Sequence, residues 1–171
     1  PLHVHSHYSL LDGLAKIEDI VTKAKEDGME AVALTDHGVM YGAVEFYQKC
    51  KAAGIKPIIG VEAYIVDDRK RREASEEERF HLVLLAKDLE GYQNLIKLSS
   101  IGFLDGFYYK PRIDKEILKE HVKGLIALSG GYMSEVDELL RLDRFDEAKE
   151  VIGFYEEVFG KGNYFLELVD R

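Results

Sequence analysis

Short apolar runs alternate along the chain with longer segments in which apolar residues recur every three or four positions. The apolar runs predict strands at residues 2–5, 31–35, 57–66, 80–86, 107–109, 125–129 and 164–169. The helical spacing predicts helices over residues 17–27, 41–53, 91–100, 115–121, 134–142 and 145–159, with Gly54 as a C-cap. This alternation is typical of a parallel sheet covered by helices, and seven strands favour a (β/α) barrel over a small open sheet.

One segment departs from this pattern. Residues 67–79, DDRKRREASEEER, are polar and highly charged and have no apolar face. Such a segment cannot pack against the sheet, so we expect a solvated, mobile loop here rather than a binding tail. The whole chain, residues 1–171, has the length of one domain with a proper core.

The composition narrows the class of protein. Hydrophobic residues make up 46% of the chain, yet no apolar run approaches the roughly 18–20 residues that cross a bilayer. No signal peptide is visible, and the single cysteine excludes an internal disulfide framework. These features predict a cytoplasmic protein without a membrane partner. Cys50 falls in an apolar helical pattern, and we expect it in the core.

The charge balance bears on nucleic-acid binding. The chain carries 32 acidic residues against 23 basic ones, a formal net charge of −9. Proteins that grip a nucleic-acid backbone by themselves usually carry a surplus of Lys and Arg. Strong autonomous binding to DNA or RNA is therefore not expected.

Histidines and acids gather where functional groups of parallel β/α folds are found. His3 and His5 alternate along the first predicted strand, so both can face one point, as two zinc-type ligands would. The bland alternative is a chance pair on a half-exposed strand. Asp12 belongs to the same short stretch as these two histidines. The other candidates follow or lie within later strands, and only the last, near the start of its strand, fits less cleanly: Asp36, His37, Glu62 and His81.

The strings that carry these residues, HVHSHYSLLDG, LTDHG, GVE and FHLVLLA, resemble the PHP (polymerase and histidinol phosphatase) domain. The longer strings YSLLDGLAKIEDIV and GFYYKPRID are similar to the branch found at the N-terminus of bacterial replicative DNA polymerase III alpha subunits. The resemblance implies a distorted (β/α)7 TIM-like barrel, the PHP fold, which holds up to three divalent metals. It assigns as metal ligands His3, His5, Asp12, His37, Glu62 and His81. Glu62 takes the position that bridges two metals, and Asp36 is expected to hold an imidazole or a backbone amide rather than to bind a metal itself.

Departures from the family pattern lower the expected number of metals. Gly131, in LSGGYM, stands where metal-binding members carry a cysteine. The last two family ligands belong to a strand beyond YFLELVDR, so we expect a barrel truncated before its last strands. Imidazole and carboxylate ligands suit zinc, manganese or iron without choosing among them.

Three functions remain open. The resemblance implies a structural module of a DNA-directed DNA polymerase, with the other domains of the alpha subunit as partners, and a proofreading exonuclease subunit as a further one. Primer–template DNA would then be reached through the holoenzyme. The alternatives are an active metal-dependent 3′–5′ exonuclease or phosphoesterase, and a free-standing phosphatase of histidinol-phosphatase type, against which Asp12 weighs. In an active site, phosphate and base contacts would come from Lys110, Arg112, Tyr108 and Tyr109, whose alternative is helix-flanking surface and core.

Overall fold

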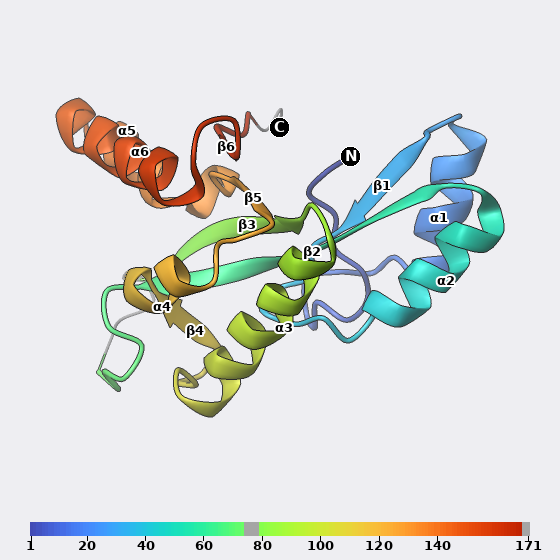
Figure 1. Cartoon of the computed structure of the whole chain (residues 1–171), viewed down its shortest axis with the longest axis horizontal. Helices are drawn as coiled ribbons and strands as arrows, with labels where there is room; N and C mark the ends of the chain where they lie inside the picture. The colour runs from blue at the N-terminus through green and yellow to red at the C-terminus, as the bar shows by residue number, and fades with distance from the viewer. Residues whose placement is uncertain (74–78, 169–171) are drawn as a thin grey trace.

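The computed structural model describes residues 1–73 and 79–168, which form a mixed α/β fold with helices packed around one sheet (Figure 1). The elements follow in the order α1 (Ile17–Glu26), β1 (Ala31–Leu34), α2 (Ala43–Ala53), β2 (Lys56–Val66), β3 (Phe80–Ala86), α3 (Leu89–Leu104), β4 (Arg112–Asp114), α4 (Lys115–Glu120), β5 (Leu125–Leu128), α5 (Glu135–Arg141), α6 (Phe145–Phe159) and β6 (Tyr164–Phe165). A 3₁₀ turn, Gly131–Met133, separates β5 from α5. No helix in the described ranges is both long and apolar enough to span a bilayer.

The long strand β2 organises the sheet. Its first residues, 56–59, pair in parallel with β1, and its last residues, 64–66, pair in parallel with β4 on the same edge. Along its other edge, residues 60–65 pair with β3 in the antiparallel direction. Beyond β3 come β5, antiparallel to it, and β6, parallel to β5. In the described residues the order runs β1-β2-β3-β5-β6, and the sheet is open.

The prediction of an all-parallel sheet is wrong at β3. A parallel neighbour requires a crossover, usually a helix, between the two strands. Residues 67–79 contain no apolar face from which such a helix could be built. The chain therefore returns beside β2 in the opposite direction, and the sheet is mixed.

Two segments that were predicted as strands do not form regular strands. Residues 2–5 run beside β1, with the Ala33 amide donating to Pro1 O and the Thr35 amide to Val4 O, but the Val4 amide donates to the Thr35 hydroxyl and no regular ladder forms. Residues 107–109 form a tight turn closed by the Tyr108 amide and Lys110 O, at 3.1 Å. The strand comes after the turn, at β4.

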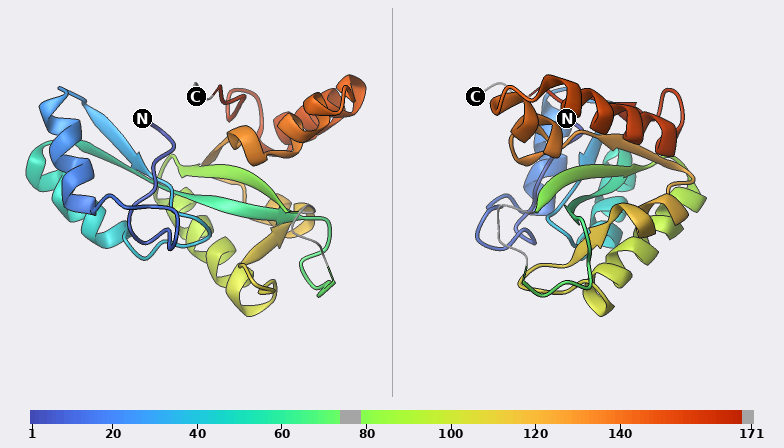
Figure 2. Two further views of the ribbon diagram at one scale, coloured as in Figure 1. Left: turned by 180° about the vertical axis from the view of Figure 1, so that it is seen from behind. Right: turned by 90° about the vertical axis from the view of Figure 1, so that its left-hand side faces the viewer.

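The core lies on both sides of the sheet. Near β1, apolar side chains of α1 and α2 pack together, among them Ile17, Phe46 and Cys50, all 0% exposed. Cys50 is therefore a core residue, as predicted, and burial raises the pKa of its thiol to about 11. The larger cluster joins β2, β3 and β5 to α3, α4 and α6. Figure 2 shows α1 and α2 at one end of the molecule, with α3 and the α5–α6 pair on opposite sides of the sheet.

The charged segment after β2 is attached to the fold at its start. The Arg69 guanidinium donates to Asp114 at 2.8 Å, and the Arg69 and Arg71 carbonyls accept hydrogen bonds from Arg112. Residues 74–78, the middle of the predicted mobile loop, lie outside the described residues.

Candidate metal centre

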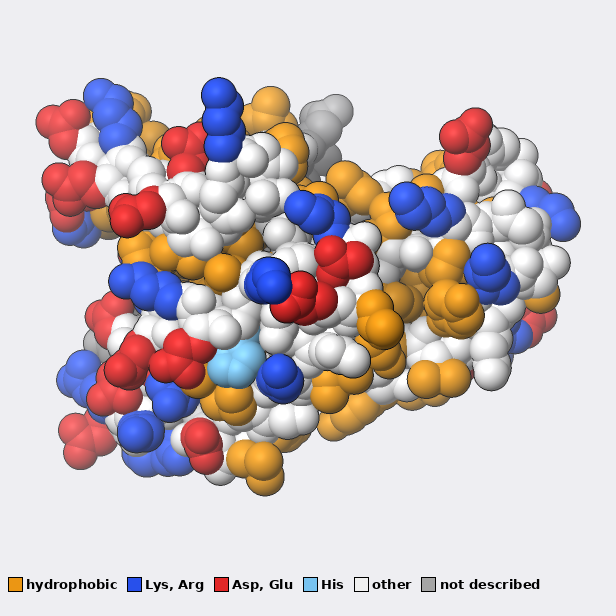
Figure 3. All heavy atoms as spheres, in the orientation of Figure 1, with side chains coloured by type: hydrophobic (Ala, Val, Ile, Leu, Met, Phe, Trp, Pro, Cys, Tyr) orange, Lys and Arg blue, Asp and Glu red, His pale blue; other side chains and the backbone are white. Residues whose placement is uncertain are grey.

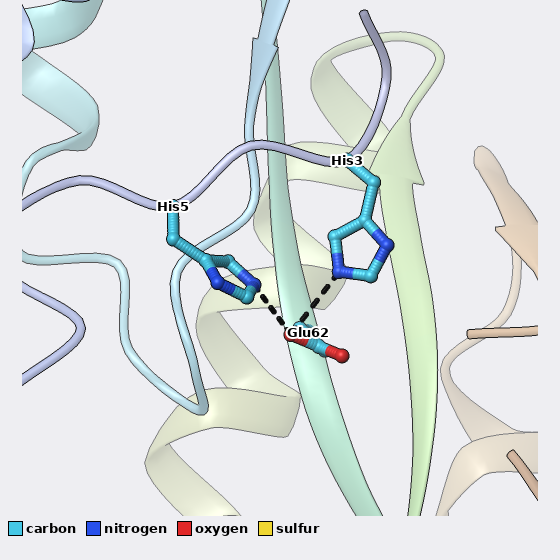
Figure 4. Close-up of side chains that lie close together, drawn as sticks. All are labelled: His3, His5 and Glu62. Atoms are coloured by element: carbon cyan, nitrogen blue, oxygen red, sulfur yellow. Dashed lines mark hydrogen bonds and ion pairs between the residues drawn. The ribbon is translucent and has the colours of Figure 1, made fainter. Parts of the chain in front are cut away.

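One carboxylate, Glu62, lies at the middle of a ring of imidazoles. Its position within β2 leaves it only 2% exposed. Glu62 Oε2 lies 3.1 Å from His3 Nε2, 2.5 Å from His5 Nε2 and 3.0 Å from His37 Nδ1. The other oxygen, Oε1, lies 2.7 Å from His81 Nδ1. Figure 4 shows the His3 and His5 rings converging on this carboxylate from the N-terminal segment.

The turn TDHG after β1 brings His37 to Glu62. The pairing of β1 with β2 continues past the strand end, because the Glu62 amide donates to Asp36 O and the Gly38 amide to Glu62 O. His37 is thereby bridged to Glu62 as its neighbour in the sheet. Gly38 has a φ of +64°, and a Cβ there would meet Pro111 Cγ at 2.6 Å. The glycine thus lets the chain turn close to Pro111 directly after placing His37.

The antiparallel direction of β3 explains the position of His81. In the register of β2 and β3, His81 stands opposite Tyr64. Glu62 and Tyr64 are two residues apart on one strand, so their side chains share a face of the sheet with His81. The start of an antiparallel strand lies beside the carboxyl end of its neighbour. His81 therefore reaches the same end of the sheet as the other candidates, although it begins its strand.

Asp36 holds the loop that carries the remaining candidates. It is 1% exposed and accepts hydrogen bonds from the Ser6 amide at 2.6 Å, the Ser6 hydroxyl at 2.8 Å and the Ser9 hydroxyl at 2.7 Å. Ser9 Oγ in turn accepts from the His37 amide. Of the two roles that the resemblance implied for Asp36, the structure shows contact with a backbone amide rather than with an imidazole.

Asp12 closes the centre from the solvent side. Its Oδ2 lies 2.7 Å from His5 Nδ1 and 3.1 Å from His37 Nε2, while its side chain is 54% exposed. Burial acts to raise the pKa of this carboxyl, but the hydrogen bond with His5 and the nearby His37 outweigh it and lower the pKa. Asp12 is thus the one accessible carboxylate among the six predicted ligands.

Glu62 and histidines around it shift one another's pKa. Burial disfavours ionised Glu62, but its close contacts with His3, His5 and His81 outweigh it and hold the pKa of this carboxyl well below its usual range. Burial likewise opposes a charged His3, yet the hydrogen bond with Glu167 and the adjacent Glu62 raise its pKa to about 10. The pKa of His5 is raised against burial by the same Glu62, whereas burial lowers that of His37. An anionic Glu62 is therefore matched by positive charge on its surroundings, a charge that a divalent cation can also supply.

The donor atoms fit a metal site. Three groups of ligand atoms each lie within 4.8 Å of one another: His3, His5 and Glu62; His5, Asp12 and His37; and His37, Glu62 and His81. Within the described part of the chain, the buried nitrogens His3 Nε2 and His37 Nδ1 have no hydrogen-bond partner of good geometry. Shared members, a central carboxylate and unpartnered nitrogens are what a cluster of carboxylate-bridged cations requires.

Sequence reasoning missed one residue of the centre, Glu167. It follows β6, and its Oε1 lies 2.8 Å from His3 Nδ1. An acidic residue directly after an apolar strand run was the available signal. The signal was weak, because only the fold shows that β6 ends opposite the N-terminal segment.

The predicted phosphate and base contacts divide into two groups. Arg112 is 0% exposed and donates to the carbonyls of Gly106, Arg69 and Arg71, so the prediction that it clamps a phosphate is not compatible with the structure. Its guanidinium covers the ring of half-buried Tyr108 at 5.3 Å. The two exposed candidates are Tyr109 and Lys110.

Lys110 is the exposed candidate that lies toward the centre. Its Nζ lies 5.7 Å from the ring centroid of Tyr64. Tyr64 is stacked at 5.8 Å on His37 and meets His81 edge-on at 5.2 Å. Burial, with the nearby Glu62, raises the pKa of Tyr64 to about 12, so its hydroxyl stays protonated at neutral pH.

Comparison with known proteins gives consistent matches. The family model of the PHP domain matches residues 1–171. DNA polymerase III subunit alpha of Deinococcus radiodurans is 52% identical over 180 residues, which cover 99% of this chain and 13% of that protein. The protein of the same name from Borreliella burgdorferi is 49% identical, over 98% of this chain and 15% of its own length. The chain thus spans about a seventh of these relatives. Among solved structures, an amidohydrolase from Chromobacterium violaceum is 26% identical with a TM-score of 0.45, over 60% of this chain and 32% of that one.

Proposed function

Because this chain belongs to the PHP domain family, we propose that it is the N-terminal, metal-binding PHP domain of a bacterial DNA polymerase III alpha subunit, where it has a structural role. Identity of about half of all positions to polymerase alpha subunits, across nearly the whole chain, supports this assignment over a free-standing phosphatase. The partners are then the other domains of the alpha subunit, with a proofreading subunit and primer–template DNA reached through the assembled, cytoplasmic polymerase.

One observation carries the proposal of metal binding: six potential ligands form three overlapping groups of three. They are His3, His5, Asp12, His37, Glu62 and His81. They come from the N-terminal segment, the loop after it, the turn after β1, and strands β2 and β3. A cation held between these segments stabilises the fold, because the unfolded chain has no such site.

These ligands would suit a zinc, manganese or iron ion, with Glu62 as the central carboxylate that holds it. Such an ion would polarise a phosphoester and lower the pKa of a bound water. This chain's own residues then do the positioning. Glu62 and the imidazoles hold the centre, Asp36 fixes the loop of His5 and Asp12 through Ser6, and the mouth of the centre lies toward exposed Asp12.

The fold proposed for the intact domain is a distorted (β/α)7 barrel. The open edges of the described sheet support it. The N-terminal segment that runs beside β1 and the residues after β6 both line an apolar cleft of about 1150 Å³. In a barrel these two edges belong to neighbouring strands.

The proposal is tested by measuring the metal content of the chain purified without chelator, together with its thermal stability before and after EDTA treatment. We expect about one metal ion or more per chain, and a melting temperature that falls on metal removal. Glu62→Gln should lose the metal. Glu135→Gln is the matched control, because Glu135 is a half-buried carboxylate bonded to Lys115 outside the centre. A metal content near zero in the unmutated chain would overturn the proposal.

A second candidate function, hydrolysis of a phosphoester at the 3′ end of DNA, is favoured by Lys110. This exposed cation lies over Tyr64 beside the centre, where it can meet a phosphate oxygen. The metal-loaded chain should then shorten a primer with a mismatched 3′ end, and Lys110→Ala should slow the reaction without loss of metal. Lys123→Ala, at an exposed lysine paired with Glu90, is the control. A metal-loaded chain that leaves the primer intact would restrict the domain to its structural role.

A further inference from the structure

The His3 imidazole lies between two carboxylates. Its Nε2 faces Glu62 Oε2 at 3.1 Å, inside the candidate centre, and its Nδ1 lies 2.8 Å from Glu167 Oε1, on the outer side. A carboxylate that accepts from Nδ1–H fixes the tautomer in which Nε2 carries a free lone pair. We propose that Glu167 is a positioning residue that holds His3 with Nε2 turned to the metal. This role rests on the proposed function.

Glu167 is itself held rigidly. Its amide donates to Ser129 Oγ at 2.9 Å, and the Ser129 amide donates to Phe165 O at 2.9 Å. Ser129 is 6% exposed and directly follows β5. The backbone of Glu167 is thereby tied to the end of β5, beside the N-terminal segment.

The burial of Glu167 indicates a specific contact. Its side chain is 14% exposed, and its Oε2 is buried without a hydrogen-bond partner in the described ranges. Burying an ionised carboxylate destabilises the fold unless a partner compensates its charge. His3 is that partner. The contact joins residues 164 positions apart.

The pair also lies at the apolar cleft. Leu2 and His3 of the N-terminal segment line it together with Phe165, Leu166 and Glu167. Figure 3 shows hydrophobic side chains gathered on the face between α2 and the start of α3, where the cleft opens. The His3–Glu167 contact therefore joins the two edges of the open sheet at the metal centre.

Glu167 acts through His3 and is not a ligand. It is absent from the three groups of the described residues whose donor atoms meet within 4.8 Å, and its oxygen faces the nitrogen of His3 that points away from Glu62. Loss of such a partner typically lowers metal affinity by about 10–100-fold. We expect that range for Glu167→Ala, and a smaller loss for Glu167→Gln, whose amide oxygen can still accept from Nδ1–H.

The test uses zinc as the probe, with affinity measured by competition with a chromophoric chelator. Long-range 1H–15N spectra of the histidine rings give a second readout. In the unmutated chain His3 should show a protonated Nδ1 and a zinc-bound Nε2, and Glu167→Ala should weaken this state. Glu135→Ala is the matched control, since it removes a carboxylate of similar exposure, 18%, that is bonded to Lys115. Its zinc affinity should not change.

The outcomes separate the two proposals. Zinc binding that is equally tight in the unmutated chain and in Glu167→Ala would overturn the role of Glu167 alone. An unmutated chain without zinc affinity would overturn the proposed function, and the inference with it. A fall in affinity in Glu167→Ala that is matched by Glu135→Ala would show a general loss of fold and also overturn the inference.

Discussion

Replacing Asp36 with Ala removes the acceptor on which the loop of His5 and Asp12 depends. Asp36 accepts three hydrogen bonds of 2.6–2.8 Å, from the Ser6 amide and hydroxyl and from the Ser9 hydroxyl. Each hydrogen bond to a charged group contributes about 1.5–3 kcal/mol, and donors left buried add a desolvation cost. Because the three bonds share one carboxylate, their contributions are not additive. We expect the free energy of unfolding to fall by about 3–5 kcal/mol.

This loss is a large part of the roughly 5–15 kcal/mol that stabilises a typical domain. Urea unfolding followed by circular dichroism, in the presence of EDTA, measures it without any contribution from metal. Asp88→Ala is the control with the same chemical change. Asp88 is an exposed N-cap of α3 that accepts from one amide, Gly91, so its loss should be about 1 kcal/mol. If Asp36→Ala is no more destabilising than Asp88→Ala, the reasoning about this buried network is refuted.

The other two predictions concern the turn after β1 and the charged segment. Gly38→Ala should lower the free energy of unfolding by about 1–3 kcal/mol, because its φ is +64° and the new Cβ would meet Pro111. Gly153→Ala, where a Cβ meets nothing within 4 Å in α6, should instead be neutral or stabilising; a similar loss in both variants would contradict the argument. Burial opposes ionised Asp114, but the Ile117 amide and Arg69 outweigh it and lower the pKa of this carboxyl. Asp114 should therefore stabilise the fold above the unfolded pKa of about 3.9, an effect lost as the pH falls toward the lower folded pKa. As the pH is lowered from 7 to 3, the urea midpoint of unfolding should fall less in Asp114→Asn than in the unmutated chain. Midpoints that fall equally in both proteins would refute this.

Local patterns predicted the helices well. The spacing of Ile17, Val21 and Ala24 gave the buried face of α1, and Gly54, with a φ of +76°, ends α2 as expected. α3 is longer than predicted, since it begins after the N-cap Asp88, whose side chain accepts from Gly91. Helices are predictable because their hydrogen bonds and packing faces are set by residues three or four apart.

Strand partners were less predictable. The apolar run of β3 is as compatible with a parallel as with an antiparallel neighbour, and only its register with β2 in the fold decides between them. Arg112 illustrates the same limit for single residues. In the sequence, the cation in YYKPR fits a phosphate contact as well as a place on a helix-flanking surface or in the core, but in the fold it is fully buried and binds backbone carbonyls.

The sequence by itself determined the helices and the buried apolar runs, because both depend on residue types and short spacings. The resemblance of its motifs to a known family supplied the six potential ligands. Only the tertiary structure decided that β3 runs against β2, which brings His81 to Glu62, and that β6 ends beside the N-terminal segment, which brings Glu167 to His3. Contacts between residues as far apart as 3 and 167 depend on how the whole sheet is ordered. That strand order cannot be predicted from any local sequence pattern.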